Sequence, residues 1–215
     1  MDFFSLRNII SAFSPFYVNG YPFLIMVWNI LLAMVPFIFF LALSSYWQKT
    51  KFKKTGQKIL AIVLFLFWLI FLPNAAYLIA DTRHLLNYCP SNSYLSVCVS
   101  GVWEIMFFFV YSVFGWVFLV IYLSQMRKFL AEIFKERTAR TAIMIIIPLV
   151  ALGVLLGLTE RFNSWDFFIH PLPILQNLLR YVTAWEYFRN WLAFTTGYYI
   201  LYFFGDYLFA KKIAQ

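Results

Sequence analysis

The sequence predicts an all-α integral membrane protein, and three observations predict it: the composition, the lengths of the apolar stretches and the placement of the positive charges. Of the 215 residues, 63% are hydrophobic, 23% are aromatic and only 12% are charged, whereas soluble proteins average about 25% charged residues. The mean hydropathy is +0.77. These apolar residues exceed what one soluble core of this length holds, so lipid must surround part of the chain. A soluble enzyme, a disordered tail and a DNA-binding domain are excluded.

Five stretches are apolar and long enough to cross a hydrocarbon core, which takes about 20 residues. They are residues 22–46, 59–80, 102–123, 141–158 and 191–210. No internal repeat or soluble segment lies between them, so we expect one polytopic domain covering residues 1–215. Pro36, Pro73 and Pro148 remove backbone donors from these stretches, and we expect the polar side chain of Asn74 to satisfy a group freed by Pro73.

The basic residues predict the orientation of the spans. The formal net charge is +8, and twelve of the 17 Lys and Arg residues follow the first, third and fifth stretches. Because short cytoplasmic loops retain Lys and Arg, we predict that the N-terminus lies outside and the C-terminus lies in the cytoplasm. A nucleic-acid partner would instead require a basic face on a folded soluble surface, so we expect no nucleic acid.

Two further segments, residues 3–13 and 172–184, are too mixed to span the membrane. The second carries an apolar stripe made of Leu172, Leu175, Leu179 and Val182. This pattern predicts helices that lie in the plane of the interface. The alternative is that both segments only cap the bundle.

Gly153 and Gly157 form a pair of small residues one helical turn apart in the fourth stretch. Such a pair allows two helix backbones to approach closely inside a membrane. The neighbour is either a helix of the same chain or a helix of another protomer.

Polar residues gather at the predicted outer ends of three spans. One face of the second span carries Asn74, Tyr77 and Asp81, and Glu104 lies near the start of the third. The segment after the fourth span adds Arg161, Asn163, Trp165 and Asp166. Because ionisable groups at membrane depth are costly and usually functional, we expect one outward-facing polar site. The alternative is that the charged residues only pair with each other among the lipid headgroups.

Three segments of the chain resemble a known family. They are WNILLA at 28–33, FLPNAAYLIAD at 71–81 and RFNSWD at 161–166, in that order. Together they resemble the bacterial membrane family catalogued as domain of unknown function 1361. The resemblance implies a multi-pass protein of a bacterial cell membrane and supplies no activity. The matched polar or special positions are Asn29, Pro73, Asn74, Tyr77, Asp81, Arg161, Asn163, Trp165 and Asp166.

Asp81 and Asp166 are the catalytic candidates, because paired carboxylates act as general acid and base when burial separates their pKa values. His84 and His170 follow them closely. The sequence has no HExxH or CxxC spacing, so we predict neither a metal nor a cofactor.

Cys89 and Cys98 are the only cysteines, and both fall in the predicted outer loop between the second and third spans. Two thiols in a short loop on an oxidising face form a disulfide most simply. Free thiols and thiolate metal ligands are the alternatives.

These observations support three hypotheses for the function. The first is a transport-type protein or accessory subunit that binds a small polar or amphipathic ligand in its outer site. The second is a membrane-embedded enzyme that acts on a lipid-linked or cell-envelope substrate. The third is a structural partner whose polar cluster locks helices together. The expected partners are the lipid bilayer and other membrane subunits or further copies of this chain.

Overall fold

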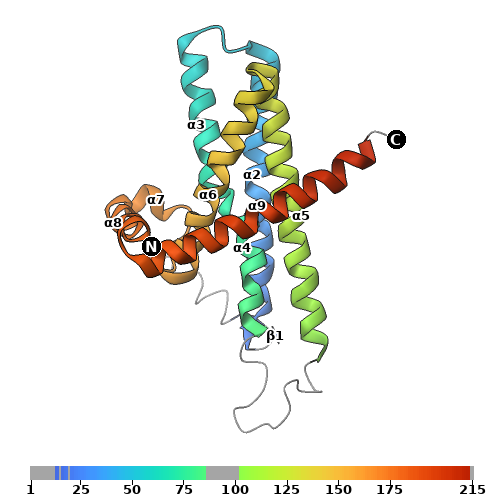
Figure 1. Cartoon of the computed structure of the whole chain (residues 1–215), viewed down its shortest axis with the longest axis vertical. Coiled ribbons are helices and arrows are strands. Elements are labelled where there is room, and N and C mark those ends of the chain that lie inside the picture. Colours follow the sequence, from blue (N-terminus) through green and yellow to red (C-terminus); the bar gives the residue numbers. More distant parts are fainter. Residues whose placement is uncertain (1–12, 15, 19, 86–101, 214–215) are drawn as a thin grey trace.

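A computed structural model describes residues 13–14, 16–18, 20–85 and 102–213, and nearly all of its elements are helices (Figure 1). A two-residue hairpin, β1 (Tyr17–Val18) and β2 (Tyr21–Pro22), leads into the bundle. The helices are α2 (Phe23–Thr50), α3 (Thr55–Phe71), α4 (Pro73–Ala80), the 3-10 helix η1 (Asp81–Leu85), α5 (Val102–Ile133), α6 (Glu136–Thr159), α7 (Asp166–Ile169), α8 (Pro171–Thr183) and α9 (Trp185–Ile213). The all-α fold predicted from composition is confirmed.

Four of the five predicted spans are helices long and apolar enough to cross a membrane. They are Phe23–Thr50, Thr55–His84, Val102–Ile133 and Glu136–Thr159. The second of these combines α3, α4 and most of η1. Large apolar side chains point away from the bundle, as with Ile38 at 63% and Ile62 at 58% exposure. Such exposure suits side chains that face lipid, because a soluble protein rarely presents so extended an apolar surface.

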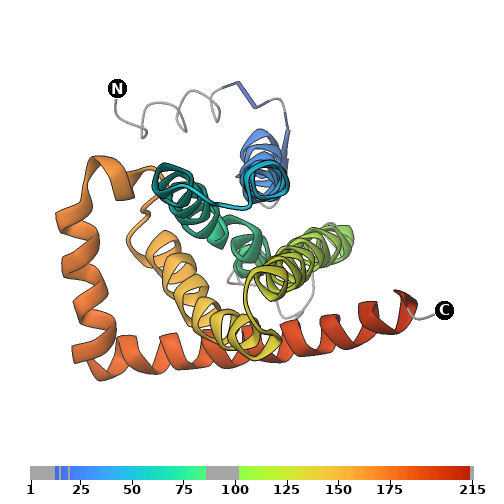
Figure 2. The same ribbon diagram turned by 90° about the horizontal axis from the view of Figure 1, so that it is seen from above.

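The fifth predicted span lies within α9, which differs from the other four. Among the residues that the structure describes, α9 is not one of the helices apolar enough to span. It runs across α5 and α6 instead of along them, as both views show (Figures 1 and 2). Residues 191–210 include two threonines, four tyrosines and Asp206, which lower the hydropathy of this segment. The fifth crossing and the orientation of the two ends therefore stay predictions.

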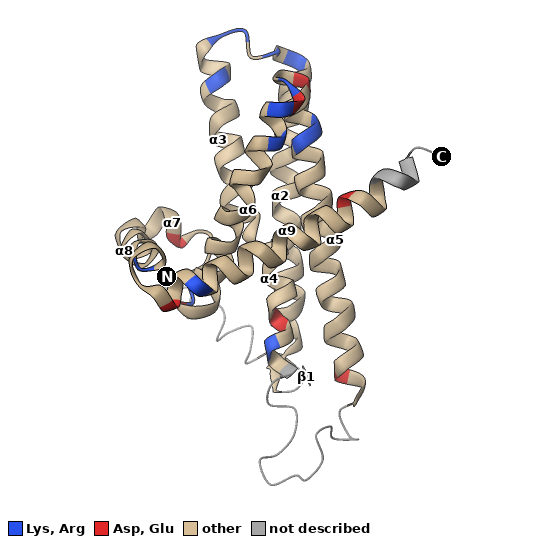
Figure 3. Cartoon of the chain, viewed as in Figure 1, with Lys and Arg blue, Asp and Glu red and all other residues tan. Residues whose placement is uncertain are grey.

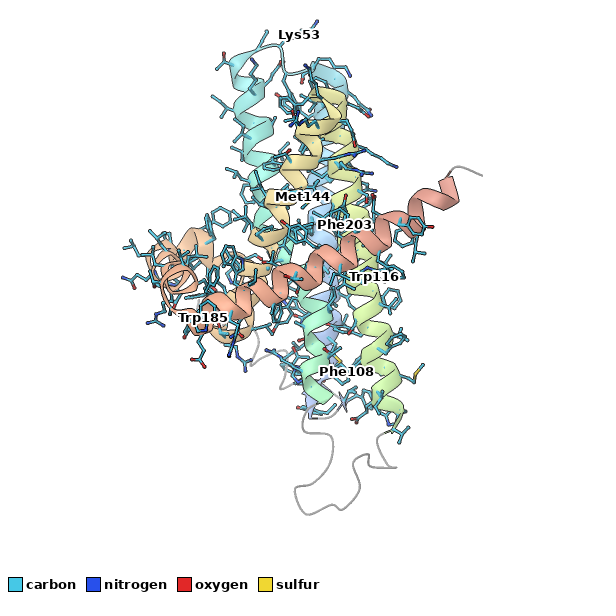
Figure 4. All side chains as sticks on the ribbon, viewed as in Figure 1. Lys53, Phe108, Trp116, Met144, Trp185 and Phe203 are labelled. Carbon is cyan, nitrogen blue, oxygen red and sulfur yellow. The ribbon has the colours of Figure 1, made fainter. Side chains whose placement is uncertain are left out.

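Contacts with α5 and α6 hold α9 in this crosswise position. The Trp116 indole N–H donates to the Leu201 carbonyl at 2.9 Å, and Trp116 and Met144 both lie where α9 crosses (Figure 4). Pro148 has no N–H, so it leaves the Met144 carbonyl without its helical partner. The Tyr199 hydroxyl donates to that carbonyl. One polar group freed inside α6 is thus satisfied from α9.

Pro73 separates α3 from α4 and produces the break in the second span. The Ala75 N–H donates to Leu72 O at 3.1 Å, so Phe71 O lacks its normal α-helical donor. The Asn74 amide donates to Phe71 O at 2.8 Å. Asn74 therefore satisfies a carbonyl left open at the break, as expected, although the carbonyl that the missing Pro73 N–H itself leaves free is that of Leu69.

The short helix α4 is held between α5 and α6. A Cβ added to Gly115 of α5 would lie 2.6 Å from Leu78 Cβ and 2.7 Å from the Ala75 carbonyl. On the other side, a Cβ on Gly153 would collide with the Pro73 ring. The same α6 face brings Gly157 against the ring of Tyr77. The neighbour of the Gly153–Gly157 pair is therefore α4 of the same chain.

Lys and Arg residues gather at one end of the bundle, around the connections between α2 and α3 and between α5 and α6 (Figure 3). The labelled Lys53 marks this end in Figure 4. The 32 residues of α5 extend about 48 Å, well beyond the hydrocarbon thickness of about 30 Å.

The segment predicted to lie in the interface at residues 172–184 is the helix α8. Its apolar stripe points outward: Leu172 is 70%, Leu175 56% and Val182 68% exposed. The buried Tyr181 hydroxyl and Thr159 share a hydrogen bond of 3.0 Å that ties α8 to the end of α6, and burial raises the pKa of Tyr181. The first predicted interfacial segment, residues 3–13, lies almost entirely outside the described residues.

Candidate functional site

The predicted polar site divides into two parts, and the first is a buried cluster around Asp81. The side chain of Asp81 is fully buried. Its Oδ2 accepts hydrogen bonds from the Asn29 amide at 3.3 Å and from the Tyr111 hydroxyl at 3.4 Å. These donors come from α2 and α5, so the carboxylate joins three separate segments of the chain.

The other oxygen of Asp81 faces two basic side chains of η1. Its Oδ1 lies 3.8 Å from an Arg83 nitrogen and 3.8 Å from Nε2 of His84. The Tyr21 ring stacks on His84 with ring centres 4.0 Å apart. A buried carboxylate requires hydrogen bonds and a nearby positive charge to offset its lost hydration. We call Asn29, Asp81, Arg83, His84 and Tyr111 the Asp81 cluster.

The second part is an open cavity of about 610 Å³ between α2, α3, α4 and α6. Three helices each turn one face toward it, and the lining residues of each helix follow the i, i+3, i+4, i+7 spacing of a single helical face. These faces are Ile25, Trp28, Asn29 and Leu32 of α2, Val63, Leu66, Phe67 and Ile70 of α3, and Leu149, Leu152, Gly153 and Leu156 of α6. Phenylalanines of α7 and two apolar residues of α8 complete the wall. Most of the cavity surface is therefore hydrocarbon.

Four polar residues line this cavity where α4 begins and α6 ends. We call them the polar mouth: Asn74, Arg161, Asn163 and Ser164. The Asn74 amide donates to the Ser164 hydroxyl at 2.9 Å. The bond ties the break in the second span to the segment that follows α6, ninety residues away in sequence. Tyr77 lines the same cavity, and its hydroxyl accepts a 2.7 Å hydrogen bond from Arg83.

Arg161 differs from the other described residues of the cavity lining, because none of them is charged. Its side chain is exposed, and within the described part of the chain its guanidinium makes no hydrogen bond or ion pair. Its backbone has φ of 63°, the left-handed conformation that glycine usually supplies just after a helix.

Asp166 and Asn163 form a local turn. The Asp166 carboxylate accepts the Asn163 backbone N–H at 2.6 Å and its side-chain amide at 3.3 Å. Asp166 is not among the cavity-lining residues, and these hydrogen bonds belong to a network separate from that of Asp81. The structure therefore does not present the two carboxylates as a hydrogen-bonded pair.

The other sequence candidates lie near these two parts. Glu104 is in the first turn of α5, and Trp165 immediately precedes α7. Neither of them lines the cavity. Within the described residues no group of three or more His, Asp or Glu side chains is arranged to hold a metal ion. Cys89 and Cys98 lie outside the described residues, so their disulfide stays a prediction.

Sequence reasoning missed two contributions to the site. Ser164 was not a candidate, although it stands between Asn163 and Trp165 in a segment that was singled out. The α3 face of Val63, Leu66 and Ile70 reads as an ordinary lipid-facing stripe, because periodicity cannot distinguish lipid from the wall of a cavity.

Comparison with known proteins gives one family. The model described as "Protein of unknown function (DUF1361)" matches residues 28–204, which include the Asp81 cluster, the polar mouth and all of the described cavity lining except Tyr21 and Ile25. No curated protein and no solved structure matches the chain.

Proposed function

The chain belongs to the DUF1361 family of unknown function, and from that starting point we propose that it binds an amphipathic ligand in the cavity between α2, α3, α4 and α6. This makes it a binding or accessory subunit of the membrane. The observation that carries the proposal is the composition of the cavity, which has apolar walls over most of its surface and the polar mouth at one place. Ligand sites commonly combine apolar walls with a few polar groups that fix orientation.

The extent of the cavity favours an elongated ligand. Along the second span the lining residues extend from Val63 to Tyr77, about 20 Å at the rise of a helix. That is about two thirds of the hydrocarbon thickness of a bilayer. A small sugar or a lone cation would leave most of this apolar wall without a partner, whereas an amphiphile covers it.

The enzyme hypothesis has less support than ligand binding. That hypothesis requires Asp81 and Asp166 to act as general acid and base on a substrate. Asp81 is fully buried, and Asp166 bonds to Asn163 and does not line the cavity. The Asp81 cluster instead has the properties of a structural lock, because it joins α2, η1 and α5. We assign helix locking to this cluster and ligand binding to the cavity.

A tryptophan placed in the cavity tests the proposal. Leu66→Trp adds a bulky ring to the lining, whereas Ile62→Trp adds the same ring one turn away on a 58% exposed position outside the lining. Native mass spectrometry of the detergent-purified chain would count retained lipid-sized adducts. We expect Leu66→Trp to lose them and Ile62→Trp to keep them; equal retention by the two variants would refute the proposal.

The outward orientation of the polar mouth requires its own test. Ser164→Cys and Lys53→Cys, in a chain with Cys89 and Cys98 replaced by Ser, place a thiol at the polar mouth and at the lysine-rich end. A membrane-impermeant maleimide added to intact cells should label position 164 and leave position 53 unlabelled. The reverse labelling pattern would mean that the polar mouth faces the cytoplasm. It would not affect the proposal that the cavity binds a ligand.

A further inference from the structure

We propose that the ligand of the cavity is an anionic phospholipid-type amphiphile, with its phosphate on Arg161 and Ser164 and its hydrocarbon chain along the walls formed by α2, α3 and α6. The inference rests on the proposed function and specifies the class of ligand. It follows from the charge of the lining, from the donors left available at the polar mouth and from the backbone conformation of Arg161.

The charge of the lining determines the sign of the ligand. Among the residues that the structure describes, Arg161 is the only charged one in the lining. Asp81, Glu160 and Asp166 all lie outside the described lining. Asp81 is buried and accepts from Asn29 and Tyr111, and Asp166 bonds to Asn163. A cationic headgroup would therefore meet a guanidinium with no carboxylate in the lining to offset it. An anionic headgroup would meet an opposite charge.

The polar mouth also supplies hydrogen-bond donors suited to a phosphate. The Ser164 hydroxyl accepts from Asn74, and within the described residues it donates to no protein group, so its own hydrogen is available. The Arg161 guanidinium offers five N–H donors in a planar fork that matches phosphate oxygens in pairs. Asn74 uses its amide nitrogen on Phe71 O and on Ser164, and its role is to position the hydroxyl.

The backbone conformation of Arg161 indicates that its side chain has a role other than stabilising the fold. At φ of 63° a residue with a Cβ is strained relative to glycine. The guanidinium makes no hydrogen bond or ion pair to any described residue that would offset this cost. Strain of this kind is typical of positions where the side chain serves a ligand.

The same feature provides a clean test. Arg161→Gly removes the guanidinium and relieves the backbone, so the melting temperature should stay equal or rise while anionic lipid is lost. The readout is native mass spectrometry after exchange with phosphatidylglycerol or phosphatidylcholine of identical chains. Arg161→Gly and Arg161→Gln should lower the preference for phosphatidylglycerol about tenfold or more, and Arg161→Lys should keep part of it.

The matched control is Arg180→Gln. Arg180 is an exposed arginine of α8 outside the cavity lining, so this variant loses the same charge and should keep the full preference. Ser164→Ala should reduce the preference by a smaller factor than either Arg161 variant. If Arg180→Gln and Arg161→Gln lowered the preference for phosphatidylglycerol equally, the preference would reflect the overall positive charge of the protein. That result would overturn the proposed site at Arg161.

Three further outcomes separate the possible failures. If wild-type protein retains both lipids equally and Leu66→Trp removes both, the anionic preference is wrong and the proposed function stands. If Leu66→Trp removes neither lipid, the cavity is not the binding site and both proposals fail. If inorganic phosphate at millimolar concentration displaces phosphatidylglycerol completely, the site takes a free anion and the lipid assignment is overturned.

Discussion

The Asp81 cluster and the polar mouth lie beside the same short helix, α4, and differ in what surrounds their charged group. Asp81 is fully buried and meets donors from α2, η1 and α5. Arg161 is exposed at the edge of a cavity, and within the described chain its guanidinium has no bonded partner. Both residues are candidates on sequence alone. Their surroundings indicate different roles. The buried carboxylate of Asp81 stabilises the fold, whereas the exposed guanidinium of Arg161 is available to a ligand.

Removal of the buried carboxylate should give the largest effect. Asp81→Ala leaves the Asn29 amide and the Tyr111 hydroxyl without their acceptor and removes the counter-charge of Arg83. We expect a loss of about 2–4 kcal/mol of stability. Thermal unfolding in detergent measures it, with Arg161→Gly as the comparison that loses none. Comparable destabilisation by the two variants would remove the distinction between the two regions.

A second prediction concerns the contact that holds α4 beside α5. Gly115→Ala would put a methyl group 2.7 Å from the Ala75 carbonyl and even closer to Leu78. Since backbone atoms cannot rotate away, we expect a loss of about 1–3 kcal/mol. The control is Gly197→Ala in α9, where an added Cβ would contact no other part of the described chain within 4 Å, and it should be neutral or slightly stabilising because alanine favours helix. Unfolding curves for the two variants check both expectations.

Asn74 connects the break in the span to the polar mouth, so its replacement should affect both stability and binding. Asn74→Ala removes hydrogen bonds to Phe71 O and to Ser164. We expect a stability loss of about 1–2 kcal/mol together with weaker retention of lipid. Ser164→Ala is the control for stability, since it removes only the bond between Asn74 and Ser164 and keeps the one to Phe71 O. Full lipid retention by Asn74→Ala would show that Ser164 does not need this positioning.

The ion pair between α5 and α9 should give the smallest effect. Asp206 accepts from Ser124 at 3.0 Å and lies 3.2 Å from Arg127, with both ion-pair side chains 22% exposed. A partly exposed pair contributes little, so Asp206→Asn should cost about 0.5 kcal/mol. The same unfolding assay places this variant on a scale between Asp81→Ala and Arg161→Gly. A loss as large as that of Asp81→Ala would show that partial exposure is a poor guide here.

The sequence predicted the helices better than it predicted the site, and the reason is physical. Apolar runs of about 20 residues and their charged ends identified the first four spans. The break at Pro73 and the role of Asn74 followed from the missing backbone donor. The fifth stretch shows the limit of that reasoning. Its aromatic content is high, but α9 lies across α5 and α6, and its side chains donate to carbonyls of neighbouring helices, Trp191 to Pro148 O and Tyr198 to Ala76 O.

The sequence predicts one polar cluster where the structure has two separate parts. Spacing along a helix shows which residues share a face, but it does not show which other helix packs against that face. Asn74 and Asp81 share a face and lie seven residues apart, about 10 Å along a helix. That distance is enough to put one in the polar mouth and the other in a buried network. Which helix stands opposite each residue depends on Gly115 and Gly153, whose effect is on packing between segments far apart in sequence.

The crosswise helix α9 has a consequence for the biogenesis of this protein. The ribosome delivers α9 after every helix it touches, so α6 enters the bilayer with the Met144 carbonyl still lacking its donor, and Tyr199 arrives about fifty residues later. A nascent chain released before residue 191 leaves that carbonyl and the Trp116 indole N–H without their partners on α9. Truncated chains of this kind are expected to be substrates for membrane quality-control proteases.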